Sequence, residues 1–218
     1  TLPALTDAAR ALPGIQFDWV VEEGFAEIPA WHPAVAQVIP VAIRRWRKHP
    51  WQTFKSGEWR RFKVRLRETK YDLVIDAQGL LKSAWLTRYV QAPVVGLDRD
   101  SAREPLASRF YDKTYCVPKN QHALERVRQL FAQALGYPLP QGIGDYGLDR
   151  ASMADAALPP YLLFLHGTTW ASKHWPEHEW RALAEHMNSQ GWRGLNALPA
   201  DWSTRRCCQN STWPVWPR

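Results

Sequence analysis

Short apolar runs alternate with helical patterns over the first 135 residues of the chain. Runs of strand length lie at residues 17–21, 38–43, 71–76, 94–97 and 114–117. Apolar positions recur at helical spacing at residues 2–12, 80–89 and 121–135, and Asn120 and Gly136 are expected to cap the last of these helices. Strands that alternate with helices in this way predict an α/β fold built on a doubly wound, largely parallel sheet.

A linker and a second, shorter pattern follow. Residues 136–160 are rich in Gly, Pro, Asp and Ala, which is typical of a linker. A strand at 161–165 then leads to a helix that has Pro176 near its first turn and stops at Gly191. We therefore expect a first domain at 1–150, a linker with the first β-α unit of a second domain at 151–193, and a tail at 194–218.

The expected tail has neither a helical nor a strand period. A single β-α unit cannot cover its own apolar face, because a sheet needs neighbouring strands. The chain also starts without an initiating Met and within a helical pattern. These features predict an incomplete chain, and translation in a shifted reading frame could produce such a tail.

Composition favours a cytoplasmic globular protein. Of the 218 residues, 45% are hydrophobic and 22% are charged, which is ordinary for a soluble domain. No apolar run approaches the roughly 20 residues that a membrane-spanning helix needs, and the first residues do not resemble a signal peptide. The three cysteines match neither a disulfide framework nor a metal-binding spacing, so no metal site is predicted.

The chain is basic, with a formal net charge of +7. This balance points to an anionic partner, which could be nucleic acid, anionic lipid or a phosphorylated small molecule. The densest charge lies in residues 44–70, where eleven cations face two glutamates. The later cations are spaced like one polar face of a helix, for which a solvated surface is the simpler interpretation. The first four follow a strand directly and are expected on a loop at the sheet edge, where they could bind an anion: Arg44, Arg45, Arg47 and Lys48.

Two further segments follow strands. Residues 76–83 join a strand end to a helix that bears Lys82, and open α/β sheets bind ligands at this edge. Asp76 could contact a substrate there or cap the helix. Residues 166–176 combine the hydroxyls of Thr168 and Thr169 with Lys173 ahead of a helix N-terminus, an arrangement that can bind a diphosphate. An ordinary surface loop is the alternative for this second segment.

Taken together, several segments resemble one family. Residues 18–25, 40–48, 74–80 and 102–108 closely resemble bacterial lipopolysaccharide heptosyltransferase I, and residues 173–176 with Trp180 are similar to the donor-domain loop of that family. The resemblance runs from Thr1 to about Arg193. It implies the Rossmann-like N-terminal domain of a two-domain GT-B glycosyltransferase, present here in incomplete form.

The resemblance also implies a reaction. The family transfers L-glycero-D-manno-heptose from ADP-heptose to the Kdo sugar of Kdo2-lipid A, with inversion, during synthesis of the lipopolysaccharide inner core, and it requires no metal or other cofactor. By resemblance, the first domain would bind the phosphates and carboxylates of the acceptor through Arg44, Arg45, Arg47, Lys48, Lys82, Arg103 and His122. The donor diphosphate would be bound by Thr168, Thr169 and Lys173, and the lysine would offset charge on the departing ADP. We expect a monomer, in peripheral contact with the cytoplasmic face of the anionic inner membrane, and no nucleic-acid partner.

The sequence also departs from the family pattern. The family's catalytic base is an aspartate in a Gly-Asp loop that would precede residue 1, so no catalytic residue is assigned here. Most of the donor domain has no counterpart, and residues 170–172 differ from the acidic residues expected before Lys173. We therefore expect this chain to be inactive alone. Two alternatives stay open: a basic nucleic-acid-binding module built on residues 44–70, and a residual acceptor-binding domain without activity.

Overall fold

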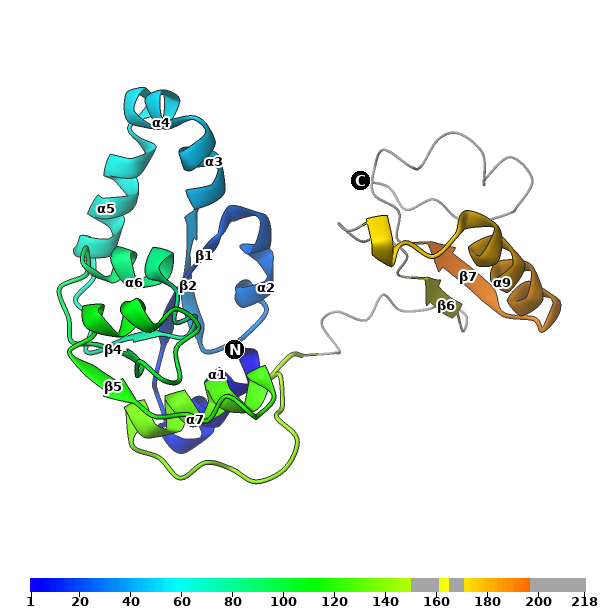
Figure 1. The fold of residues 1–218 in the computed structure, drawn as a ribbon. Helices are drawn as coiled ribbons and strands as arrows, with labels where there is room; N and C mark the ends of the chain where they lie inside the picture. The colour runs from blue at the N-terminus through cyan, green and yellow to red at the C-terminus, as the bar shows by residue number, and fades with distance from the viewer. Residues whose placement is uncertain (150–160, 165–170, 197–218) are drawn as a thin grey trace. The chain divides into compact units, whose positions relative to one another are not determined.

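The computed structural model describes residues 1–149, 161–164 and 171–196 (Figure 1). The chain divides into two compact units, Thr1–Arg150 and Ala151–Arg218. Each unit is described by itself below. The binding roles that the sequence assigns to the two domains stay predictions.

The first unit contains two parallel sheets. β1 (Phe17–Glu22) pairs with β2 (Val35–Val41), and a second sheet has the order β3 (Val74–Asp76), β4 (Val94–Leu97), β5 (Lys113–Tyr115). Every strand pair in the described residues is parallel, which confirms the predicted α/β fold with a largely parallel sheet. The strand that the resemblance places before Thr1 stays a prediction.

Helices connect the strands of the first unit. α1 (Leu2–Ala11) precedes β1, and η1 (Glu23–Phe25) with α2 (Glu27–Ala30) joins β1 to β2. The connections after β2 are α3 (Ile43–Lys48), α4 (Pro50–Ser56), α5 (Glu58–Glu68), α6 (Leu81–Thr87), η2 (Pro105–Phe110) and α7 (Ala123–Leu135). Within this unit α4 lies at the end opposite to α1 and α7, and α3 and α5 lead to it and away from it (Figure 1).

The ends of α7 are only partly as predicted. Gly136 ends the helix with a φ of +75°, a left-handed conformation that glycine adopts without strain. The N-cap is His122 rather than Asn120, because the Nδ1 atom of His122 accepts a hydrogen bond from the Leu124 backbone amide at 3.3 Å. The helix is therefore capped by the imidazole of His122 and not by the amide of Asn120.

α1 packs against α7 in the largest of the buried clusters. Ala4, Leu5 and Ala8 of α1 meet Phe131 and Ala132 of α7. The sequence predicts one apolar face for α1, but two polar residues of this helix, Thr6 and Asp7, are buried as well. The helix is therefore covered on nearly all sides over its first two turns, and its buried polar groups need partners.

Arg128 of α7 supplies the partner for Asp7. Its side chain is 2% exposed, and its Nε donates to Asp7 Oδ2 at 2.6 Å. Its remaining donors reach Glu125 at 3.1 Å and the carbonyl oxygens of Gly142 and Pro140 at 2.9 and 3.0 Å. One guanidinium thus joins α1, α7 and the segment after α7. The Asp7 hydrogen bond is the main cause that raises the pKa of Arg128, so its charge is retained.

The second unit is a β-α-β arrangement. β6 (Tyr161–Phe164) pairs in parallel with β7 (Arg193–Asn196), and η3 (Ala171–Lys173) and α9 (Glu177–Ser189) lie between them in the chain. The predicted tail is therefore wrong for residues 194–196, which belong to a strand. The Gly-Leu-Asn run is too short to display a period, and its pairing with β6 defines it as a strand. Residues 197–218 lie outside the described part of the chain. In the described residues no helix is long and apolar enough to cross a membrane.

Replacing Arg128 by Met should destabilise the first unit by about 3–5 kcal/mol, because it leaves a buried Asp7 carboxylate without its ionic partner. The free energy of unfolding from urea denaturation, followed by circular dichroism, measures the effect. Arg10 of α1 forms an exposed ion pair with Asp145, and Arg10→Met should cost about 1 kcal/mol or less. Equal losses in the two variants would contradict the structural role of Arg128.

Candidate functional site

The carboxylate of Asp76, at the end of β3, organises the loops at the carboxyl end of its sheet. Asp76 is 6% exposed. Its Oδ1 accepts from the backbone amide of Gln78 at 2.9 Å, and its Oδ2 accepts from the hydroxyls of Ser83 and Tyr111, both at 2.8 Å. Asp76 therefore fixes the β3–α6 loop and the first turn of α6. The N-cap of α6 is Leu80, without a side-chain cap hydrogen bond, so Asp76 holds this loop and does not cap the helix.

Two glycines allow this arrangement. A Cβ on Gly96 of β4 would collide with the Tyr111 ring, so only glycine lets that ring pass to Asp76. Gly79 has a φ of +61°, and a Cβ there would lie 3.3 Å from the Arg103 backbone nitrogen. The Glu104 amide donates to the Gly79 carbonyl at 2.9 Å. The β3–α6 loop and the loop after β4 are consequently packed against each other.

This packing positions two of the predicted acceptor residues. Lys82 lies in the first turn of α6, and the backbone of Arg103 lies against Gly79. The Leu81 amide donates to Glu104 Oε2 at 2.6 Å, which joins the start of α6 to the same loop. Both cationic side chains are exposed. The structure thus brings the elements that bear Lys82 and Arg103 together at the carboxyl end of β3, where open α/β sheets bind ligands.

The four cations after β2 lie on a helix and not on the predicted loop. They are in α3, which begins two residues after β2 ends. The helical turn places Trp46 on the buried cluster that contains Val41, Phe62 and Leu66. Because that one aromatic side chain is held inside, the flanking side chains of Arg44, Arg45, Arg47 and Lys48 are exposed. Ile43 of the same helix also packs against this cluster.

Arg45 differs from the other three cations. Its Nε donates to Glu23 Oε1 at 3.0 Å, and its Nη2 lies 2.8 Å from Glu58 Oε2. The indole Nε1 of Trp46 also donates to Glu58 Oε2 at 2.8 Å. The Arg45 guanidinium, first, and the Trp46 indole lower the pKa of Glu58 from 4.5 to about 2. Arg45 therefore ties η1, α3 and α5 together, and its charge is largely compensated within the molecule.

An aromatic cluster joins α3, α5 and α6. Trp59 of α5 stacks on Trp85 of α6 with ring centroids 5.3 Å apart, and it meets Trp46 of α3 edge-on at 5.4 Å. Tyr89 packs edge-on against both Trp59 and Trp85 at 5.3 Å. The helices that carry Arg47 and Lys82 thus share one rigid support. This cluster accounts for part of the high tryptophan content of the chain.

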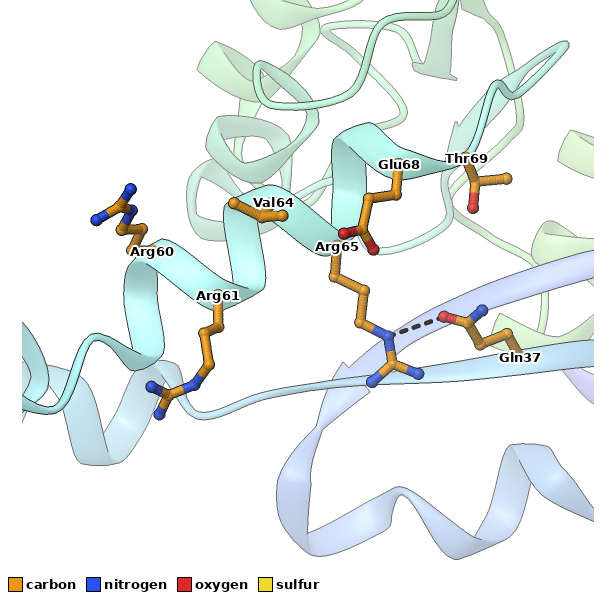
Figure 2. Close-up of a pocket in the computed structure, with 7 residues that line it drawn as sticks. All are labelled: Gln37, Arg60, Arg61, Val64, Arg65, Glu68 and Thr69. Carbon is orange, nitrogen blue, oxygen red and sulfur yellow. Dashed lines mark hydrogen bonds between the residues drawn. The ribbon is translucent and has the colours of Figure 1, made fainter.

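A basic groove lies between α5 and β2 (Figure 2). Its volume is about 550 Å³, and its lining residues are Gln37, Arg60, Arg61, Val64, Arg65, Glu68 and Thr69. Arg65 is held by hydrogen bonds from Nε to Gln37 Oε1 at 2.8 Å and from Nη2 to the Val38 carbonyl at 3.1 Å. Arg65 extends toward Gln37 of β2, whereas Arg60 points away (Figure 2). The sequence predicts only a polar helix face here, and Arg65 in fact attaches that helix to the sheet.

The other predicted site residues are His122 in the first unit and Thr168, Thr169 and Lys173 in the second. His122 is exposed, and its Nδ1 is engaged in capping α7. Lys173 is exposed in η3 of the second unit. Thr168 and Thr169 lie outside the described residues. The described residues contain no group of three or more His, Cys, Asp or Glu side chains that could hold a metal ion.

A parallel α/β unit with cations at its strand ends is typical of proteins that bind phosphorylated ligands. The chain belongs to glycosyltransferase family 9 (heptosyltransferase), whose model matches residues 59–195. It is 77% identical over 194 residues to lipopolysaccharide heptosyltransferase 1 of Pseudomonas aeruginosa, which covers 88% of this chain and 55% of that protein.

Two solved structures agree with this assignment. The Escherichia coli heptosyltransferase WaaC with ADP superposes with a TM-score of 0.86 at 51% identity, covering 89% of this chain and 62% of that chain. The same enzyme with ADP-2-deoxy-2-fluoro heptose gives a TM-score of 0.85 at 51% identity, covering 91% and 64%. The chain thus spans between 55% and 64% of the length of these relatives. The predicted family and the Rossmann-like GT-B fold class are confirmed.

Replacing Arg45 by Met should raise the pKa of Glu58, yet leave it below 4.5, because the Trp46 indole still donates to the carboxylate. A carboxyl whose pKa is lowered on folding stabilises the fold fully above its unfolded pKa near 4.5. That stabilisation is lost as the pH falls toward about 2. Titration of the Glu58 carboxyl by NMR measures the shift. Arg47→Met is the matched control and should leave the pKa of Glu58 at about 2; a shift of equal size there would contradict the assignment.

Replacing Tyr111 by Phe should destabilise the first unit by about 1–3 kcal/mol, because a buried Asp76 oxygen loses a donor. Burial, first, and the Asp76 charge raise the pKa of Tyr111 above its usual value of 10. The unfolded chain therefore ionises this phenol before the folded one does, and stability should fall as the pH rises past 10. Urea denaturation between pH 8 and 11 tests both points. Tyr146→Phe, at an exposed ring, is the control and should leave the free energy of unfolding as it is in the unchanged chain.

Proposed function

We propose that this chain is the acceptor-binding part of an inverting heptosyltransferase that uses ADP-heptose. The observation that supports this proposal is the 77% identity over 194 residues to lipopolysaccharide heptosyltransferase 1 of P. aeruginosa. The relative from E. coli is described with ADP-2-deoxy-2-fluoro heptose, an analogue of a sugar-nucleotide donor. The proposed acceptor is the Kdo sugar of Kdo2-lipid A, and the product would enter the lipopolysaccharide inner core.

The acceptor would be bound by cations whose charge the fold leaves available. Arg44, Arg47 and Lys48 are exposed on α3, and within the described residues their side chains form no hydrogen bond or ion pair. Lys82, in the first turn of α6, follows the β3–α6 loop, and Arg103 lies in the loop that packs on it at Gly79. Guanidinium and ammonium groups on rigid elements suit the phosphates and carboxylates of this lipid. His122 would contribute through the ring nitrogen that does not cap α7. Arg45 would act by holding α3 in place.

The donor would be bound by the second unit. Thr168 and Thr169, with Lys173, would contact the diphosphate of ADP-heptose, and the ammonium of Lys173 would offset negative charge that develops on departing ADP. We propose that this reaction uses no metal ion. We also propose that residues 1–218 alone bind the acceptor without transferring heptose. The reaction would take place at the cytoplasmic face of the inner membrane, where the acceptor lipid lies.

Replacing Arg47 by Ala should weaken the binding of Kdo2-lipid A in detergent micelles by about threefold to tenfold, because one charge-assisted contact is lost. The dissociation constant from isothermal titration calorimetry measures the change, and the salt dependence of binding should become shallower. Lys119→Ala, at an exposed lysine outside the predicted site, is the control and should bind as the unchanged chain does.

Two results would overturn the proposal. The first is equal binding of Kdo2-lipid A by the Arg47→Ala variant and the unchanged chain. The second is salt-dependent binding of DNA at submicromolar strength with no affinity for the lipid, which would favour the nucleic-acid module instead.

A further inference from the structure

The short helix α4 exposes two large aromatic side chains on one face. Trp51 is 77% exposed and Phe54 is 81% exposed, whereas Thr53 on the opposite face is 9% exposed. Positions three apart are neighbours on a helix surface, so the two rings form a single apolar patch. In the described residues neither ring takes part in an aromatic contact, although Trp46, Trp59 and Phe62 of the adjoining helices pack against one another.

The helix that carries this patch is firmly held. α4 starts at Pro50 and ends at Ser56, and its C-cap Gly57, with a φ of +68°, turns the chain directly into α5. The Thr53 hydroxyl donates to the His49 carbonyl at 3.0 Å, and the Arg61 guanidinium donates to the Ser56 carbonyl at 2.8 Å. The two rings are therefore presented by an ordered element, and exposing them costs free energy unless a partner covers them.

Cations surround the patch. Arg47 and Lys48 precede α4, Lys55 lies within it, and Arg60 follows on α5, all exposed. Residues 44–70 contain eleven cations and two glutamates, and one of those glutamates, Glu58, is already paired with Arg45. α4 also lies at one end of the first unit, so the patch and its cations can meet a flat surface (Figure 1).

We propose that α4 docks the first unit on an anionic lipid bilayer, with Trp51 and Phe54 entering the headgroup region and the cations contacting lipid phosphates. Trp is suited to this boundary, because its ring is apolar and its indole N–H can still meet water or headgroups. Each Lys or Arg near an anionic membrane surface adds attraction, and the apolar side chains add burial. A second copy of the chain is a less suitable partner for this patch, since it would bring the same positive charge to the contact and the two surfaces would repel each other.

This inference extends the proposed function to the membrane in which the acceptor lies, but its test needs neither sugar nor acceptor. The chain should cosediment with vesicles of phosphatidylcholine and phosphatidylglycerol, and binding should weaken when phosphatidylglycerol is omitted or salt is raised. The double variant Trp51→Ala/Phe54→Ala should lower the partition coefficient by about tenfold or more. The control Phe25→Ala/Trp31→Ala removes two exposed rings from η1 and the end of α2, and it should bind as the unchanged chain does.

Fluorescence quenching locates the contact. Brominated lipids in the same vesicles should quench part of the tryptophan emission, and Trp51→Phe should remove that part while it preserves binding, because an aromatic ring is retained. Circular dichroism and thermal unfolding should be unchanged in all variants, since the substituted side chains are exposed.

Equal partitioning of the double variant and the unchanged chain would overturn the proposal. So would a chain that ignores anionic vesicles but dimerises through Trp51 and Phe54, as sedimentation equilibrium would reveal. Loss of vesicle binding with retained affinity for micellar Kdo2-lipid A would separate this surface from the acceptor site. The reverse result, vesicle binding without affinity for Kdo2-lipid A, would support the membrane-docking proposal and contradict the proposed function.

Discussion

The buried carboxylate of Asp76 accepts hydrogen bonds from Gln78, Ser83 and Tyr111, segments as far as 35 residues apart in the chain. A buried carboxylate is costly unless donors surround it, so these three groups must keep their positions for the unit to remain stable. The geometry in turn demands glycine at position 96, where any side chain would meet the Tyr111 ring. The shape of the sheet edge that carries Lys82 and Arg103 follows from this one charge and its donors.

Cations serve two different purposes in the first unit. Arg45, Arg65 and Arg128 are engaged with carboxylates or carbonyl oxygens and hold helices in place. Arg47 and Lys48 are exposed without a recorded partner in the described residues, so their charge faces solvent. The net charge of +7 therefore does not show which cations are available to a ligand.

The periodic pattern of the sequence was sufficient for the α/β fold, because each buried strand is a short apolar run and α1 and α7 have clear apolar faces. It could not separate α3 from a loop, since Trp46 packs on a cluster that includes Phe62, Leu66 and Leu86 from later in the chain. The pairing of Asp7 with Arg128, 121 residues apart, is equally invisible to local pattern. The cap at His122 and the strand β7 were missed because one depends on a side-chain rotamer and the other on pairing with β6. The sequence identified the cationic residues of the candidate site, but it could not show which arginines form ion pairs within the protein.

The proposed membrane contact and the proposed acceptor site constrain each other geometrically. α3 starts two residues after the carboxyl end of β2, and α4 follows α3 after a single residue. Parallel sheets bind ligands at the carboxyl ends of their strands. A bilayer that receives Trp51 and Phe54 would therefore lie on the same side of the sheet as α3, close to Arg47 and Lys48. A lipid whose sugars project from that bilayer would reach these cations without leaving the membrane, which would explain why one short segment carries both an apolar patch and the densest positive charge.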